Sequence, residues 1–203
     1  MSPLLASAII QEVNVYLASL SPRRWELLSQ LGIAYEPLSI AVDETLSTGE
    51  TPKHYVARLA IAKARAGQAS LQGRPPRPVL GADTTVVVER MILGKPRDRE
   101  AGLAMLAALS GREHRVLSAV ALVAGPREAL RINESRVRFR ELTPLECQAY
   151  WDTGEPADKA GAYAIQGRAA AFIVELNGSY SGVMGLPLFE TAELLRDFAI
   201  HVL

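Results

Sequence analysis

Two hydrophobic patterns follow one another along this chain. Short runs of β-branched and other apolar residues predict strands, and longer segments with apolar residues three or four positions apart predict helices. The expected strands cover residues 13–18, 34–41, 79–89, 113–123, 130–140 and 170–176. The expected helices cover residues 22–31, 52–68, 98–109, 143–151 and 186–198. Because the two kinds of element alternate, the pattern predicts an α/β fold.

Two neighbouring strand candidates indicate the type of sheet. Residues 113–123 and 130–140 are long strand candidates, separated by a turn at Gly125-Pro126. A turn of that kind joins antiparallel strands, so we expect a mixed, twisted sheet flanked by helices and not a purely parallel one.

The length of 203 residues fits one large domain or two small lobes. We expect an N-terminal extension over residues 1–12, followed by a single domain over 13–203. The apolar start is short and lacks a basic region, so we do not interpret it as a signal peptide. No apolar run approaches the ~20 residues that span a bilayer, and we expect no membrane partner.

Composition narrows the class of partner. The chain has 22 basic and 22 acidic residues, and such a balance argues against a dedicated nucleic-acid binder. Cys147 is the only cysteine, which excludes an intramolecular disulfide and favours the cytoplasm. We interpret Cys147 as a small packing residue within a helix.

Candidate chemistry begins at the first predicted helix, Ser21-Pro22-Arg23-Arg24. Serine is a good N-cap and proline suits the first helical position. Two arginines there oppose the helix dipole, unless an anion lies over the free N–H groups. Either this helix start binds a phosphate-like anion, or both arginines point into water.

A carboxylate interrupts the strand predicted at residues 79–89. Asp83 needs a cation, hydrogen-bond donors or a solvent-filled cleft, because burying an unpaired charge is costly. It is either a structural acid, paired with an arginine or ending an edge strand, or a site that holds a divalent cation or accepts a proton. Gly81 and Ala82 leave room for a close approach to the backbone, which favours a site.

Further polar residues are less specific by themselves. Lys63 falls on the apolar side of its helix, and either extends to solvent or binds a phosphate. Lys95 lies in a loop, Glu44 belongs to an acidic pair after the second strand, and Gln166 carries an amide suited to reading a base edge.

Several common chemistries are missing from the sequence. It contains neither a P-loop nor a Rossmann glycine motif. His54, His114 and His201 are scattered, without zinc-site spacing or a partner nucleophile. Cations, carboxylates and amides remain, and they suit metal-assisted attack on a phosphoanhydride.

In combination, the motifs resemble a known family. The segment Leu17-Ala18-Ser19-Leu20-Ser21-Pro22-Arg23-Arg24 is similar to the opening motif of the Maf family of nucleoside triphosphate pyrophosphatases. Gly81-Ala82-Asp83-Thr84, Gly94-Lys95-Pro96 and Gly185-Leu186-Pro187-Leu188 resemble further motifs of that family in the same order. The stretch from Glu155 to Gly167 resembles the branch that acts on dTTP and UTP.

The resemblance implies a two-lobed α/β fold with a central cleft, of the kind seen in Maf and inosine triphosphatase proteins. It implies cleavage of dTTP, UTP or modified pyrimidine nucleotides to the monophosphate and pyrophosphate, a house-cleaning activity. A divalent cation, Mg²⁺ or Mn²⁺, is expected, and a homodimer is common.

By position, Asp83 corresponds to the proposed proton acceptor, and we expect Asp83 with Glu44 to hold the metal. The expected substrate-binding residues are Ser19, Arg23, Arg24, Glu44, Lys63, Thr84, Lys95 and Gln166. Arg23, Thr84 and Gln166 correspond to positions associated with substrate choice.

Two departures from the family pattern bear on affinity and rate. Leu20 stands where the family usually has glycine, and it would strain or crowd a turn that needs a positive φ. Ala164 replaces another usual glycine. The alternative hypothesis is therefore a nucleotide-binding regulator of division or septation with little catalysis.

Overall fold

The computed structural model describes residues 13–202, so the N-terminal extension expected over residues 1–12 lies outside the described residues. The strands are β1 (Val15–Leu17), β2 (Tyr35–Pro37), β3 (Val79–Val88), β4 (Met91–Leu93), β5 (Glu113–Ala124), β6 (Arg127–Phe139) and β7 (Ile173–Asn177). The α-helices are α1 (Pro22–Gln30), α2 (Pro52–Ala69), α3 (Arg99–Leu109), α4 (Pro144–Trp151), α5 (Tyr180–Met184) and α6 (Leu188–Asp197). Short 3₁₀ helices cover Ala160–Ala162 and Arg168–Phe172.

Within residues 13–202 the strands form one seven-stranded sheet in the order β2-β1-β3-β5-β6-β7, with β4 paired to β3. β1 pairs in parallel with β2 and β3, and all other pairs are antiparallel. The expected mixed sheet is confirmed. The long β5–β6 hairpin turns at Gly125-Pro126 as expected, with Ala124 opposite Arg127.

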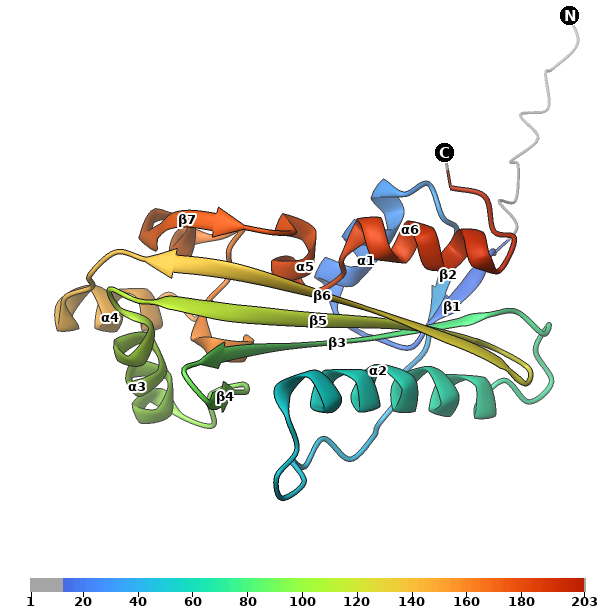
Figure 1. The fold of residues 1–203 in the computed structure, drawn as a ribbon, viewed down its shortest axis with the longest axis horizontal. Helices are drawn as coiled ribbons and strands as arrows, with labels where there is room; N and C mark the ends of the chain where they lie inside the picture. Colours follow the sequence, from blue (N-terminus) through green and yellow to red (C-terminus); the bar gives the residue numbers. More distant parts are fainter. Residues whose placement is uncertain (1–12, 203) are drawn as a thin grey trace, which may run out of the picture.

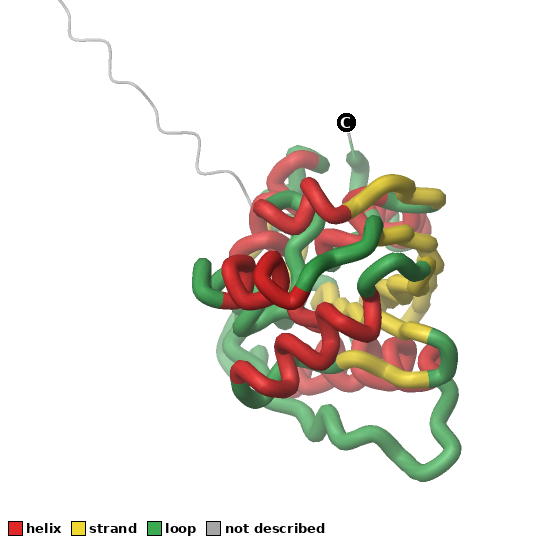
Figure 2. Tube along the Cα trace, turned by 90° about the vertical axis from the view of Figure 1, so that its left-hand side faces the viewer, coloured by secondary structure: helices red, strands yellow, loops and turns green. Residues whose placement is uncertain are grey.

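Helices cover both faces of this sheet. Figure 1 shows α2 along one face, α1, α5 and α6 along the other, and α3 with α4 at one end. In the view turned by 90° (Figure 2), the strands lie together at one side of the molecule, and a long loop extends at the bottom. This loop is the segment 38–51 between β2 and α2 (Figure 1).

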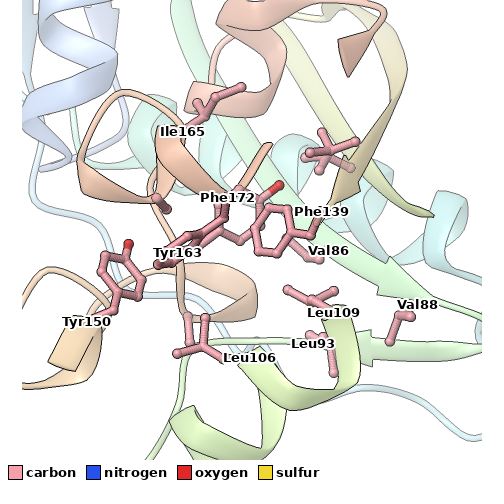
Figure 3. Close-up of a cluster of buried hydrophobic side chains, with 14 of the residues drawn as sticks. Val86, Val88, Leu93, Leu106, Leu109, Phe139, Tyr150, Tyr163, Ile165 and Phe172 are labelled. Atoms are coloured by element: carbon pink, nitrogen blue, oxygen red, sulfur yellow. The ribbon is translucent and has the colours of Figure 1, made fainter. Parts of the chain in front are cut away.

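Separate cores stabilise the two ends of the sheet. One core lies beneath α1 and α6 and includes Leu17, Leu28 and Leu194. The other lies beside α3 and α4, where Phe139, Tyr163 and Phe172 pack edge to face (Figure 3). The molecule therefore has two lobes joined by the long strands β3, β5 and β6.

Some expected elements differ from the structure. The strand expected over 34–41 is only Tyr35–Pro37, because its neighbour β1 is equally short and offers no further backbone partner. Residues 170–172 of the strand expected over 170–176 belong instead to the 3₁₀ helix Arg168–Phe172, and the strand starts at Ile173. Helix α5 was not expected, because five residues are too few to show helical periodicity.

Helix α2 lies close to β3 because a glycine on each element faces the other one: Gly81 on β3 faces α2, and Gly67 on α2 faces β3. A Cβ on Gly81 would lie 2.3 Å from the Ala60 carbonyl oxygen and 2.5 Å from the Ala64 nitrogen. A Cβ on Gly67 would lie 2.7 Å from Val79 Cγ1. The room at Gly81, which we expected to admit a ligand, is filled by the backbone of α2.

No helix among residues 13–202 is both long and apolar enough to cross a membrane. Cys147 packs in the core beside α3, in agreement with its interpretation as a packing residue.

Candidate active site

The site forms where the outer edge of β3 has no partner strand. On that edge β1 pairs with β3 only at Val79 and Leu80, and β4 pairs with it only from Val86 to Val88. Residues 81–85 have no partner strand on this edge, and Asp83, Thr84 and Thr85 among them line an opening between the two lobes. Asp83 and Thr84 lie in the middle of this gap, so the break in pairing places them at the cleft.

The opening is a cavity of about 420 Å³. All the candidate residues inferred from the sequence contribute to its lining: Ser19, Arg23, Arg24, Glu44, Lys63, Asp83, Thr84, Lys95 and Gln166. They come from β3, α2, the start of α1 and three loops. The structure thus brings together residues that are up to 147 positions apart, between Ser19 and Gln166.

The start of α1 forms one wall of the cavity. Ser21 is the N-cap and Pro22 the first helical residue, as expected, but the Ser21 side chain makes no capping bond. Arg24 turns into the cavity, where its Nε donates to the Gly185 carbonyl oxygen at 2.9 Å and its Nη1 to Ser19 Oγ at 3.4 Å. Neither partner carries charge, so the guanidinium remains available to an anion.

Burial lowers the pKa of Arg24 below its ordinary value, and the nearby Asp83 partly offsets this effect. An arginine nevertheless stays protonated under all physiological conditions. A charge held in a partly desolvated wall interacts more strongly with phosphate than a solvated one does. Of the two interpretations of this helix start, arginines that both point into water are wrong for Arg24, and anion binding stays a prediction.

Leu20 does not strain the turn before α1. The non-glycine residues with positive φ among residues 13–202 are Glu89, Ala162 and Ala199, and Leu20 is not one of them. Its side chain is 56% exposed at the rim of the cavity. Ala164 also has an ordinary φ. The strain expected at Leu20 is therefore absent.

Lys63 joins two carboxylates at the centre of the cavity. Its Nζ lies 2.7 Å from Asp83 Oδ1 and 2.6 Å from Glu44 Oε1. Its side chain is only 13% exposed, so it extends along the apolar side of α2 into the site and not into bulk water. The close approach of α2 at Gly81 makes this contact possible, because Lys63 lies between Ala60 and Ala64, which touch β3.

Asp83 is a buried acid in the middle of a strand, 7% exposed. Its partner is Lys63, which excludes both the arginine-paired acid and the acid at a strand end. Burial raises the pKa of Asp83 above its ordinary value, although the charges of Lys63 and Arg24 oppose the rise. A carboxylate with a raised pKa is a better proton acceptor than an exposed one.

Glu44 lies on the loop between β2 and α2, which is tied to the helix. Tyr55 Oη donates to the Glu44 carbonyl oxygen at 2.9 Å. Arg58 bonds both carboxylate oxygens of Glu50 and the Thr45 carbonyl oxygen. Burial by itself would raise the pKa of Glu44, but the hydrogen bond from Lys63 and the charges of Lys63, Lys95 and Arg24 together outweigh it, so the pKa is lowered.

Three more cations surround the opening. Lys95 is exposed in the loop after β4. Arg23 lies 4.0 Å from Asp158, which is also paired with Lys159, and both of these residues line the cavity. With Lys63 and Arg24, these side chains make the cleft positively charged although the whole chain is neutral.

The loop before the second 3₁₀ helix carries Gln166, which is exposed at the cavity rim. Buried hydrogen bonds hold this loop from behind. Tyr150 Oη donates to Glu155 Oε1 at 2.7 Å and accepts from the Ala164 N–H at 3.1 Å. Tyr163 Oη bonds His114 Nε2 at 2.9 Å. These contacts fix the backbone from which Gln166 projects.

Tyr55, Lys159 and Ser118 are site residues that the sequence analysis missed. Tyr55 and Lys159 line the cavity, and Ser118 Oγ lies 2.8 Å from Thr84 Oγ1. Ser118 had a detectable signal, since it is a polar residue within the apolar run of β5, just as Asp83 is in β3. Tyr55 and Lys159 gave no such signal, because tyrosine and lysine are ordinary on helix surfaces and loops.

The carboxylates of the cavity decide whether a divalent cation fits there. Among residues 13–202 no group of three or more His, Cys, Asp or Glu side chains could hold a metal by itself. Mg²⁺, however, usually binds one or two carboxylates together with waters and substrate phosphates. Asp83 and Glu44 lie close to each other, since each has an oxygen within 2.7 Å of Lys63 Nζ, the ammonium group that lies between them. Two neighbouring carboxylates in one cavity are the number that Mg²⁺ usually takes from a protein, so these residues fit such a cation.

Comparison with known proteins finds relatives that match most of this chain. A protein of Alkalilimnicola ehrlichii named dTTP/UTP pyrophosphatase is 58% identical, over 92% of this chain and 94% of its own length. A protein of Saccharophagus degradans with the same name is 52% identical, over 93% of this chain and 90% of its own.

A solved structure, the Staphylococcus aureus Ham1 protein, superposes with a TM-score of 0.44 and 16% identity, over 62% of this chain and 71% of its own. The family model described as "Maf-like protein" matches residues 14–198. With a match over nearly its whole described length, this chain belongs to the Maf family.

Proposed function

We propose that this protein is a nucleoside triphosphate pyrophosphatase that hydrolyses dTTP and UTP to the nucleoside monophosphate and pyrophosphate. The observation that carries the proposal is a buried Asp83, whose pKa burial raises, in one cavity with several cations. The choice of pyrimidine rests on two relatives above 50% identity that are named dTTP/UTP pyrophosphatase.

The cations bind the triphosphate. No carboxylate within residues 13–202 forms an ion pair with the Arg24 guanidinium, and its forked N–H groups suit phosphate oxygens. Lys95 and Arg23 line the same cavity and add two further positive charges. These charges stabilise the negative charge that accumulates on the leaving pyrophosphate.

Asp83 activates the attacking water. One of its oxygens, Oδ1, is bonded to Lys63, and no hydrogen bond engages Oδ2 within residues 13–202. The free oxygen accepts a proton as the water oxygen forms a bond to the α-phosphorus. The bond between that phosphorus and the bridging oxygen then breaks, and the bridging oxygen leaves with pyrophosphate. Lys63 holds the Asp83 carboxylate in place while that carboxylate gains and loses a proton.

Asp83 and Glu44 would hold a divalent cation, Mg²⁺ or Mn²⁺, together with the triphosphate. When bound, this cation supplies positive charge to the phosphates and helps to orient the water. The homodimer expected from the family resemblance stays a prediction.

The proposal is tested with a panel of purified nucleoside triphosphates, assayed for pyrophosphate release with and without Mn²⁺. We expect dTTP and UTP to be the best substrates. Nucleotide-dependent thermal stabilisation without release of pyrophosphate would instead support the regulator hypothesis and refute the proposal.

The same assay tests the role of Asp83. Asp83→Asn keeps the shape of the side chain but removes the proton acceptor, and we expect kcat to fall by about 10²–10⁴-fold. Asp152→Asn is the matched control, because Asp152 is an exposed acid at the end of α4, outside the cavity. An Asp83→Asn protein as active as the wild type would show that another group accepts the proton.

A further inference from the structure

A buried hydrogen-bond chain runs behind Thr84, on the wall of the cavity. Thr84 Oγ1 lies 2.8 Å from Ser118 Oγ, and Ser118 Oγ lies 2.6 Å from the Gly182 carbonyl oxygen. The remaining protein acceptor near Thr84 Oγ1 is the Gly185 carbonyl oxygen, at 3.4 Å. Ser118 is fully buried on β5, so no solvent competes for these bonds.

The direction of each proton in this chain follows from chemistry. A hydroxyl has one proton, and a carbonyl oxygen can only accept. At 2.6 Å from the Gly182 oxygen, Ser118 must donate its proton there, since two oxygens without a proton between them would repel each other. Ser118 Oγ therefore accepts from Thr84. The proton of Thr84 points into the protein, towards Ser118.

As a result, Thr84 presents only lone pairs to the cavity. A phosphate oxygen at neutral pH also has only lone pairs to offer, so it is a poor partner for this hydroxyl although Arg24 lies next to it. The substrate group that contacts Thr84 must be a hydrogen-bond donor.

We infer that Ser118 is a positioning residue for specificity: it fixes the Thr84 hydroxyl as an acceptor, which receives the N3–H of a uracil or thymine base. This inference rests on the proposed function. Uracil and thymine carry a proton on N3, whereas cytosine has a lone pair there. A cytosine ring in the same orientation would place that lone pair against those of Thr84 and lose a hydrogen bond.

Gln166 cannot supply this discrimination by itself. Its amide has both an acceptor and a donor end, and it is exposed at the rim, so it can rotate to match either base. Thr84 cannot adapt in this way, because Ser118 is held by β5 and the Gly182 carbonyl by α5. A fixed polarity excludes the wrong base, because it leaves a buried polar pair unsatisfied.

The experiment measures kcat/KM for UTP, CTP and N3-methyl-UTP in the wild type and in four variants. Thr84→Val removes the acceptor, and we expect kcat/KM for UTP to fall about tenfold while that for CTP changes little. Ser118→Ala frees the Thr84 proton to turn into the cavity, and we expect kcat/KM for CTP to rise about tenfold relative to UTP. Thr84→Ser keeps the hydroxyl and the wild-type preference.

Thr191→Val is the matched control. Thr191 is fully buried on α6 and donates to the Pro187 carbonyl oxygen at 2.7 Å, as Ser118 does to Gly182, but it lies outside the cavity. We expect it to lower the melting temperature and leave the UTP-to-CTP ratio unchanged. A ratio that stays constant in both Ser118→Ala and Thr84→Val would overturn the inference, and so would rapid cleavage of N3-methyl-UTP by the wild type.

Failure of the proposed function gives a different result. In that case the wild type would not release pyrophosphate from UTP or dTTP at all, and both proposals would fall together. If the wild type cleaves UTP but the variants keep its base preference, only the inference about Ser118 is wrong.

Discussion

Gly81→Ala is the change that most directly tests how the fold builds the site. The added Cβ would lie 2.3 Å from the Ala60 carbonyl oxygen and 2.5 Å from the Ala64 nitrogen, both in the backbone of α2. Ordinary contacts begin near 3.4 Å, so α2 must move away from β3 by about 1 Å. Lys63 Nζ, now 2.7 Å from Asp83 Oδ1, would move beyond hydrogen-bonding distance.

Two effects of different size are expected from this shift. Overpacking of this kind costs about 1–3 kcal/mol of folding free energy, which corresponds to a fall in melting temperature of about 2–10 °C in a chain of this length. A misplacement of about 1 Å at a reacting group lowers the rate about 10²-fold. Thermal unfolding and steady-state release of pyrophosphate, assayed well below the melting temperature, measure the two effects separately.

Gly102→Ala is the matched control, because its Cβ would lie 2.0 Å from Trp151 Cζ3, between α3 and α4 and away from the cavity. It should lower the melting temperature but leave kcat/KM near the wild-type value. If Gly81→Ala lost stability and kept its full rate, the contact between α2 and β3 would not position Lys63 and Asp83 for the reaction.

The remaining predictions concern pH and the Glu44 loop. Burial lowers the pKa of His114 from 6.5 to about 4, so the unfolded chain binds a proton more readily and stability is lost as the pH falls from about 6.5 towards 4. Between pH 7.5 and 5, the free energy of unfolding measured with urea should fall by about 2 kcal/mol because of this group. His114→Phe should remove that part of the pH dependence of the unfolding free energy, and an unchanged pH dependence would contradict the prediction. Tyr55→Phe removes the hydrogen bond to the Glu44 carbonyl oxygen. We expect the half-saturating Mn²⁺ concentration to rise about fivefold. An unchanged value would show that the loop between β2 and α2 is held in place without this hydrogen bond.

Much of the fold could be predicted from local patterns. The start of α1 at Pro22, the capped helices α2 and α4, and the β5–β6 hairpin each depend on residues close together in the chain. The short β2 and the five-residue α5 could not be predicted, because their lengths depend on neighbours that come from elsewhere in the sequence. The room at Gly81 was recognised, but which segment fills it was not.

The candidate site shows the same division. The sequence by itself determined the residue types, the family, and the need of Asp83 for a partner, because the unfavourable burial of a charge is a local property of its strand. Only the tertiary structure decided that this partner is Lys63, that Arg24 faces the cavity, and that Ser118 lies behind Thr84. Distances and proton directions between remote segments arise from packing and strand register, and these are properties of the whole chain.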